Sequence, residues 1–172
     1  MVEQTAHIRS VIGPSPIAAI KNLTIRYVDR IYRQWYIFIV KQTKTALIVI
    51  DGSEEIKKVA EELSTALKEY KTTVCMAESF AGTELLAAYL LFLGCENPEP
   101  ASFAYLDEML QHINLSGRPC GVFSTNNKAL KYLSRLIKAS GAKTAEPLLI
   151  KDMSAVPDAL KKWIPTIPES NF

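Results

Sequence analysis

Three short polar segments carry the residues of this chain that are best suited to hold a ligand. They contain glycine, whose backbone can approach a ligand closely, and small side chains that can donate hydrogen bonds. Such groups suit a phosphate or another small polar ligand. The candidate binding residues are Gly52 and Ser53 in the first segment, Gly94 and Cys95 in the second, and Ser124, Thr125 and Asn126 in the third.

Acidic residues stand next to two of these segments. Glu54 and Glu55 directly follow the first one, where a phosphate needs bare backbone N–H groups. Their carboxylates would repel a phosphate, although they favour the start of a helix through its dipole. Asp51 and Glu54 also have the spacing of a helix capping box. In the second segment, Glu96 disfavours a thiolate at Cys95, which predicts an inert thiol.

Catalysis by side chains has no support in the sequence. His7 and His112 have no cysteine, serine or carboxylate at a spacing typical of a catalytic triad. Cys75, Cys95 and Cys120 are odd in number and lack CxxC spacing, which argues against a disulfide framework and a zinc site. Walker, GxGxxG and HExxH motifs are missing from the sequence. We therefore expect no catalytic residues, no metal, and a reducing cytoplasm as the location.

Strands and helices that could position the three segments alternate along the chain. Unbroken apolar runs predict buried parallel strands, and apolar residues at three- and four-residue steps predict helices. The predicted strands are 45–50, 72–76, 89–94, 120–124 and 148–150. The predicted helices are about 54–70, 83–88, 102–113, 127–140 and 156–163.

This alternation predicts an α/β fold with a five-stranded parallel sheet and helices on both faces. The carboxyl ends of parallel strands meet at one edge of a sheet, and ligands bind outside that edge. The loops at residues 51–55, 94–101 and 124–127 should therefore lie together.

From Lys44 to about Trp163 the chain resembles the flavodoxin family. The resemblance rests on Ala-Leu-Ile-Val-Ile followed by a short loop and Lys-Lys-Val-Ala-Glu-Glu-Leu, on Leu-Phe-Leu-Gly-Cys before a proline-bearing loop, and on Leu-Ser-Gly-Arg-Pro-Cys-Gly-Val-Phe-Ser. It implies a flavodoxin-like three-layer α/β/α sandwich. It also implies that FMN is held noncovalently by the seven candidate residues, and that the protein carries electrons between redox partner proteins.

The same three loops depart from the family pattern. The family's first loop has the form Ser/Thr-x-Thr-Gly-x-Thr, whereas this chain has Asp-Gly-Ser-Glu-Glu-Ile and keeps only the Ser53 hydroxyl. Aromatic side chains normally flank the flavin, but loops 94–101 and 124–127 contain none. Phe103 and Tyr105 are predicted to be core or surface helix residues. Two functions remain open: an electron carrier with an atypical FMN site, or a flavin-free interaction or regulatory module.

The first 43 residues differ in charge from the rest. They hold six Lys/Arg against two carboxylates, a balance of +4, which leaves −2 for the remainder of a chain of net charge +2. This distribution does not indicate a nucleic-acid groove. The spacing of apolar residues predicts a basic amphipathic helix that contacts a protein or membrane surface. Alternatively, the helix packs on the following domain, or the segment is disordered. A third alternative is that the start codon was assigned too early and the segment is not part of the natural protein.

We divide the chain into an extension (1–43), a flavodoxin-like domain (44–165) and a tail (166–172). The sequence has no uninterrupted run of about 18 apolar residues, so no transmembrane helix is predicted.

Overall fold

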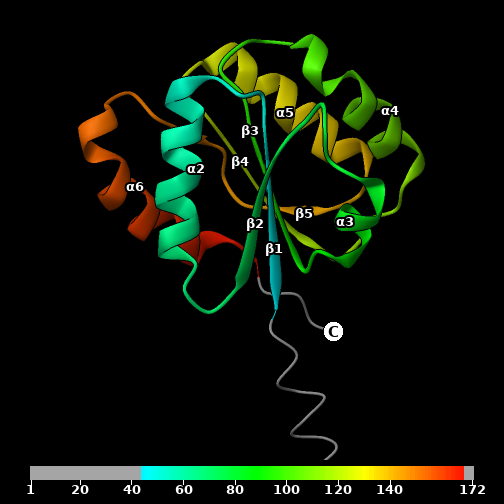
Figure 1. The fold of residues 1–172 in the computed structure, drawn as a ribbon, viewed down its shortest axis with the longest axis horizontal. Helices are drawn as coiled ribbons and strands as arrows, with labels where there is room; N and C mark the ends of the chain where they lie inside the picture. The colour runs from blue at the N-terminus through cyan, green and yellow to red at the C-terminus, as the bar shows by residue number, and fades with distance from the viewer. Residues whose placement is uncertain (1–43, 169–172) are drawn as a thin grey trace, which may run out of the picture. The chain divides into compact units, whose positions relative to one another are not determined.

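A parallel β-sheet lies at the centre of residues 44–168, the part of the chain that this computed structural model describes (Figure 1). Its strand order is β2-β1-β3-β4-β5, and β6 pairs with β4 as well. The strands are β1 (Thr45–Ile50), β2 (Lys71–Met76), β3 (Leu90–Gly94), β4 (Pro119–Ser124), β5 (Lys143–Thr144) and β6 (Leu148–Leu149). Every pairing is parallel, as predicted. The expected basic extension lies outside the described residues.

Helices cover both faces of the sheet, which confirms the predicted three layers. In Figure 1, α2 and α6 lie on one side of the sheet, and α3, α4 and α5 lie on the other. The α-helices are α2 (Glu54–Ala66), α3 (Gly82–Ala87), α4 (Ala104–His112), α5 (Asn127–Ala139) and α6 (Val156–Trp163). Short 3₁₀ turns are η1 (Ala101–Phe103), η2 (Met153–Ala155) and η3 (Ile164–Thr166). Within residues 44–168, no helix is long and apolar enough to cross a membrane.

Strand β1 shows why the apolar runs are unbroken. Successive side chains of a strand point to opposite faces of the sheet. Leu47 and Val49 enter the hydrophobic core under α3, α4 and α5, whereas Ile48 and Ile50 enter the core under α2 and α6. All four are at most 2% exposed. A strand buried on both faces therefore needs apolar residues at every position.

The predicted fifth strand is divided in two. Residues 148–150 were expected to form it alone, but Lys143 and Thr144 already pair with the start of β4, and β6 pairs with its end. Between the two pieces stands Pro147, which has no N–H to donate to a neighbouring strand. The split is thus a local consequence of proline.

Two further details differ from the sequence prediction. Helix α2 ends at Ala66, about one turn before Tyr70, and Leu67 stays buried in the turn that follows. Arg118, to which the sequence analysis gives no role, reaches the end of α3 with its guanidinium group. It donates hydrogen bonds to the carbonyl oxygens of Leu85 at 2.7 Å and Leu86 at 2.9 Å. These bonds satisfy carbonyls that a helix end leaves without partners.

Candidate functional site

The structure brings the three predicted loops to one edge of the sheet. They follow β1, β3 and β4, which are neighbours in the sheet, so the loops meet at the carboxyl ends of these strands, at the upper end of Figure 1. A backbone hydrogen bond of 3.2 Å from the Asp51 N–H to the Gly94 carbonyl joins the first two loops. All seven candidate residues therefore lie in or beside one group of loops.

The carboxylate of Asp51 binds the backbone of the first two loops. Its Oδ2 accepts hydrogen bonds from the N–H of Glu96 at 2.8 Å and, more weakly, of Asn97 at 3.5 Å. Its Oδ1 accepts one from the N–H of Ser53 at 3.2 Å. Backbone N–H groups are the donors with which such loops bind phosphate. Here an internal carboxylate, that of Asp51, already accepts hydrogen bonds from such N–H groups. The sequence predicted Asp51 only as a helix cap.

The start of α2 is neither capped nor neutral. Ser53 occupies the N-cap position, but its side chain accepts no capping hydrogen bond, and its hydroxyl is buried without a partner. The capping box expected between Asp51 and Glu54 does not form. Instead, Glu54 forms an ion pair of 2.9 Å with Lys57, and the hydrogen bond from Lys57 lowers the pKa of Glu54. Glu55 is exposed beside it, so both carboxylates are present at the helix start.

The second and third loops are joined by Ser124. This serine is fully buried; its hydroxyl donates a hydrogen bond of 2.5 Å to the carbonyl of Cys95 and accepts one of 2.9 Å from the N–H of Asn126. Asn126 in turn caps α5, since its Oδ1 accepts a hydrogen bond from the N–H of Lys128 at 2.9 Å. Thr125 is half-buried between them. Hydrogen-bonding groups that the sequence suggested for a ligand thus hold the loops to each other.

Both candidate glycines have structural explanations. A Cβ atom at Gly94 would lie 2.3 Å from the Phe123 ring and 3.0 Å from Ile56, so only glycine fits the packing there. Gly52 has a φ of +84°, which other residues rarely adopt, and an added Cβ atom would lie 3.3 Å from the sulfur of Met76. Neither glycine requires a ligand to account for it.

Burial disfavours the thiolate form of all three cysteines. Cys95 is fully buried, and burial raises its pKa to about 12, with a further contribution from the Asp51 charge. The inert thiol was predicted, but from Glu96 rather than from burial and Asp51. Burial also raises the pKa of Cys75 to about 11 and that of Cys120 to about 12. All three cysteines are free.

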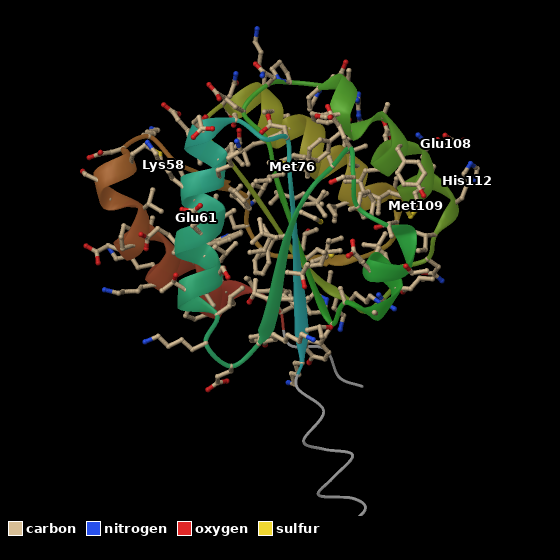
Figure 2. All side chains as sticks on the ribbon, viewed as in Figure 1. Lys58, Glu61, Met76, Glu108, Met109 and His112 are labelled. Atoms are coloured by element: carbon tan, nitrogen blue, oxygen red, sulfur yellow. The ribbon has the colours of Figure 1, made fainter. Side chains whose placement is uncertain are left out.

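Other side-chain chemistry is not assembled within residues 44–168. No group of three His, Cys, Asp or Glu residues there is placed to hold a metal ion. His112 is exposed at the end of α4 (Figure 2), at the opposite end of that helix from the second loop. His7 lies outside the described residues.

Aromatic side chains near the loops are engaged elsewhere. Phe103 is fully buried and packs edge-on against Tyr132 with ring centres 6.5 Å apart. Tyr105 is 55% exposed on α4 and contacts Phe80. The loops between β3 and η1 and between β4 and α5 contain no aromatic residue. The N–H groups of Ser53 and Glu96 are bonded to the Asp51 carboxylate, and these two loops have no aromatic side chain to flank a flavin, so the residues present do not fit FMN.

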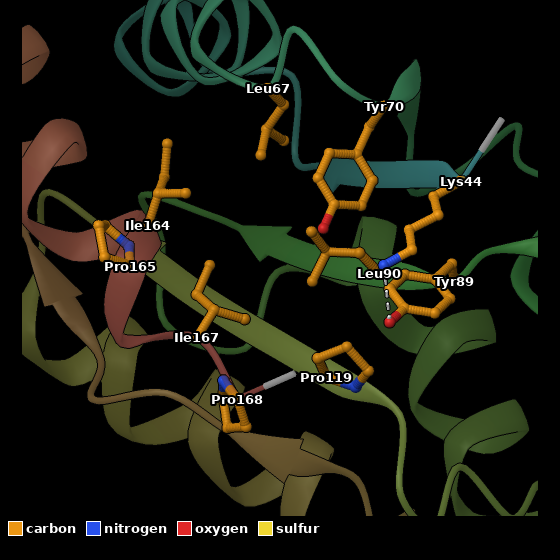
Figure 3. A pocket seen from close by; sticks show the side chains of 10 residues that line it. All are labelled: Lys44, Leu67, Tyr70, Tyr89, Leu90, Pro119, Ile164, Pro165, Ile167 and Pro168. Carbon is orange, nitrogen blue, oxygen red and sulfur yellow. Dashed lines mark hydrogen bonds between the residues drawn. The ribbon is translucent and has the colours of Figure 1, made fainter. Parts of the chain in front are cut away.

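Two hollows of the domain are lined by other residues. One, of about 370 Å³, lies between the second loop and the basic side of α5, where Arg135 forms an ion pair of 2.8 Å with Glu99. The other, of about 160 Å³, lies at the amino ends of β1, β3 and β4, at the opposite edge of the sheet (Figure 3). In it the Lys44 amine donates a hydrogen bond to the Tyr89 hydroxyl at 3.3 Å. Neither is lined by any of the seven candidate residues.

Several known structures similar to this chain are flavodoxins of low sequence identity. A short-chain flavodoxin associated with a non-canonical PDU bacterial microcompartment matches with a TM-score of 0.61 at 16% identity, covering 73% of this chain and 99% of the other. Oxidised flavodoxin 2 from Bacillus cereus matches with a TM-score of 0.60 at 19% identity, covering 70% and 95%. The Streptococcus pneumonia TIGR4 flavodoxin matches with a TM-score of 0.59 at 14% identity, covering 70% and 97%.

Comparison by sequence adds nothing to this likeness. No protein-family model matches the chain, and no curated protein matches it. Three solved flavodoxins nevertheless align over nearly their whole length with this chain. Together with the parallel sheet and its two helical layers, this shows that residues 44–168 have the flavodoxin-like fold.

Proposed function

We propose that this domain is a flavin-free flavodoxin-like module that works through protein contacts, in interaction or regulation, rather than as an electron carrier. The observation that carries the proposal is the set of hydrogen bonds from the backbone N–H groups of Ser53 and Glu96 to the Asp51 carboxylate. The loop edge that would bind a cofactor phosphate is closed by a charge of the same sign.

Electrostatics opposes a phosphate at this edge. A phosphate charge about 4 Å from the Asp51 carboxylate would be repelled by about 4 kcal/mol at an effective dielectric constant of 20. To bind, the phosphate would have to displace the Asp51 carboxylate. This carboxylate is covalently part of the loop, so its effective concentration at the N–H groups is high. Glu54 and Glu55, exposed at the start of α2, add charges of the same sign.

The alternative is an FMN-dependent electron carrier, and the structural likeness to flavodoxins favours it. In that function FMN would lie among the seven candidate residues, and the partners would be redox proteins. It requires Asp51 to leave its present hydrogen bonds and the half-buried Ser53, Thr125 and Asn126 to turn toward the cofactor.

FMN titration separates the two functions. We expect the purified full chain to be colourless and to leave FMN fluorescence unchanged at high protein concentration. A yellow protein, or saturable quenching of FMN fluorescence, would establish the electron carrier instead.

Charge variants test the reason for the exclusion. Asp51→Ser combined with Glu54→Gln and Glu55→Gln removes the local charges and adds a hydroxyl, so we expect measurable quenching. Asp51→Ser combined with Glu61→Gln and Glu62→Gln removes equal charge but keeps both carboxylates at the helix start, so we expect less. Equal nonbinding by both would assign the exclusion to loop length and missing aromatic residues.

Two further parts of the proposal concern location and partners. We propose a reducing compartment such as the cytoplasm, because all three cysteines are free thiols. We also propose that the basic segment before residue 44, with its balance of +4, contacts an acidic protein or membrane surface.

A further inference from the structure

Helix α5, the yellow helix in Figure 1, carries a stripe of positive charge on its exposed side. Four cations recur there at steps of three and four residues. At 3.6 residues per turn they fall within an arc of about 80° around the helix axis. The helix contains no Asp or Glu. The basic stripe consists of Lys128, Lys131, Arg135 and Lys138, which are all exposed.

Helix stability does not explain the basic stripe. The N-terminus of a helix carries partial positive charge, so Lys128 in the first turn of α5 is unfavourable there. Like charges three or four residues apart on a helix repel each other, and every member of the stripe has such a neighbour. In α2 and α6, by contrast, a lysine pairs with a carboxylate of its own helix. The arrangement in α5 therefore points to an anionic partner.

One carboxylate of the domain already pairs with the stripe. Glu99, in the second loop, forms an ion pair of 2.8 Å with Arg135, and both side chains are largely exposed. The guanidinium of Arg135 also lies over the Tyr132 ring, 5.5 Å from its centre. Within residues 44–168, the three lysines of the stripe form no ion pair. Their charges are thus open to a ligand, and Glu99 marks how a carboxylate binds here.

The hollow of about 370 Å³ beside α5 lies at the loop end of the stripe. Three of its four cations line this hollow against one carboxylate, that of Glu99, a local balance of +2. Pro98 and Tyr132 add apolar surface to the lining. A hollow of this kind fits an acidic side chain, whose methylene groups contact the apolar wall while its carboxylate meets the cations.

We propose that α5 binds an acidic helical segment of a partner protein. The proposal rests on the proposed function as an interaction module and names its surface. From Lys128 to Lys138 the stripe spans about 15 Å of helix axis, so glutamates at positions i, i+3, i+7 and i+10 of a partner helix have the matching spacing. The partner's carboxylates replace Glu99 at Arg135 and pair with the three lysines.

Two other kinds of anionic partner match this surface less well. Binding to a membrane surface needs apolar side chains as well as charge, and α5 has no large apolar residue that is exposed. Phosphates follow one another without a break along a nucleic acid, so some of them would lie against Glu99. A protein segment can instead place its carboxylates opposite the cations alone.

Fluorescence anisotropy with the full chain tests the proposal. The probe is a fluorescein-labelled, alanine-rich helical peptide with glutamates at positions i, i+3, i+7 and i+10, in about 50 mM NaCl, where exposed charges are weakly screened. The reference peptide has glutamines at these positions. We expect saturable binding of the glutamate peptide and binding of the glutamine peptide that is weaker by about tenfold.

A stripe variant and a matched control locate the binding surface. The stripe variant carries Lys128→Gln, Lys131→Gln and Lys138→Gln. The control removes equal charge from exposed positions on the other side of the sheet, and carries Lys58→Gln, Lys161→Gln and Lys162→Gln. We expect the stripe variant to bind the glutamate peptide about fivefold more weakly and the control to change affinity by less than about twofold. Both keep the basic segment before residue 44, so their difference reports on α5.

Glu99→Gln tests the competition at Arg135. It removes the internal carboxylate and should tighten peptide binding by about two- to fivefold. Glu61→Gln removes the same charge from an exposed position of α2 and should have a smaller effect. Circular dichroism checks that every variant is folded.

Several results would overturn the proposal. These are equal peptide affinity of the stripe variant and its control, or equal binding of the two peptides. Tighter binding of a labelled oligothymidylate or of phosphatidylserine vesicles through the stripe would assign it to another class of partner. A stripe variant that unfolds at a lower urea concentration than the unaltered chain would give the lysines a structural role. FMN binding would contradict the proposed function but leaves the peptide titration readable, so the two failures are distinguishable.

Discussion

Asp51→Ala is expected to loosen the loop edge and to destabilise the whole domain. The substitution removes one short hydrogen bond to Glu96 at 2.8 Å, a longer one to Ser53 at 3.2 Å and a weak one to Asn97 at 3.5 Å. A hydrogen bond to a charged group contributes about 1.5–3 kcal/mol. Because Asp51 is only half-buried, water replaces part of this loss, and we expect a decrease of about 2–3 kcal/mol in the free energy of unfolding.

Urea denaturation followed by circular dichroism measures this change. For a domain of this size the expected loss corresponds to an unfolding temperature lower by about 10 °C. Asp51→Asn keeps one carbonyl oxygen as an acceptor and should lose less than Asp51→Ala. Glu61→Ala, at an exposed carboxylate within α2, should change stability by less than about 0.5 kcal/mol. If Asp51→Ala costs no more than Glu61→Ala, the carboxylate does not hold the loops and our reasoning fails.

Four other changes have definite expected outcomes. Gly94→Ala forces a Cβ atom against Phe123 and should cost about 1–3 kcal/mol in urea denaturation, whereas Gly82→Ala meets the flexible end of Met109 and makes an ordinary contact of 3.6 Å with the Tyr105 hydroxyl, so it should be nearly neutral. Ser124→Ala leaves the Cys95 carbonyl and the Asn126 N–H without their partner and should cost about 1–3 kcal/mol by the same assay. Burial raises the pKa of all three thiols above the ordinary 9.0, so the protonated form is favoured in the folded state; unfolding temperatures should change little between about pH 7 and about pH 9 and fall as the pH rises toward 11 or 12, and a rise there would contradict this. A chain that begins at Thr43 should unfold at the temperature of the full chain if the extension is accessory, and a loss of several degrees in calorimetry would contradict that division.

The fold could be predicted because its signals are local. The run from Thr45 to Ile50 is apolar at every position because both faces of β1 are buried, and the periodicity of α2 follows from its single buried face. The split of the fifth strand was missed because Pro147 interrupts its pairing with β4. The sequence of the fifth strand alone does not show how that strand pairs with its neighbour. The role of Arg118 was missed for a similar reason, since its partners lie some 30 residues earlier.

The place of the candidate site could be predicted, but not the use of its donors. Parallel strands require the three loops to meet at one edge, and they do. Which group accepts the hydrogen bonds of these backbone N–H groups depends on a contact between Asp51 and Glu96, which are 45 residues apart in the sequence. The acidic character of the first loop gave a partial signal, yet it directed attention to Glu54 and Glu55, which point to solvent, rather than to Asp51.

Amide NMR of the full chain with added FMN tests the central claim most directly. The backbone N–H groups of Ser53 and Glu96 should keep their resonances unchanged as FMN is added, because the Asp51 carboxylate holds both. The same resonances should move in Asp51→Asn, which shows that they report on this contact. Saturable movement of the Ser53 and Glu96 resonances by FMN in the unaltered chain would contradict a closed, flavin-free site.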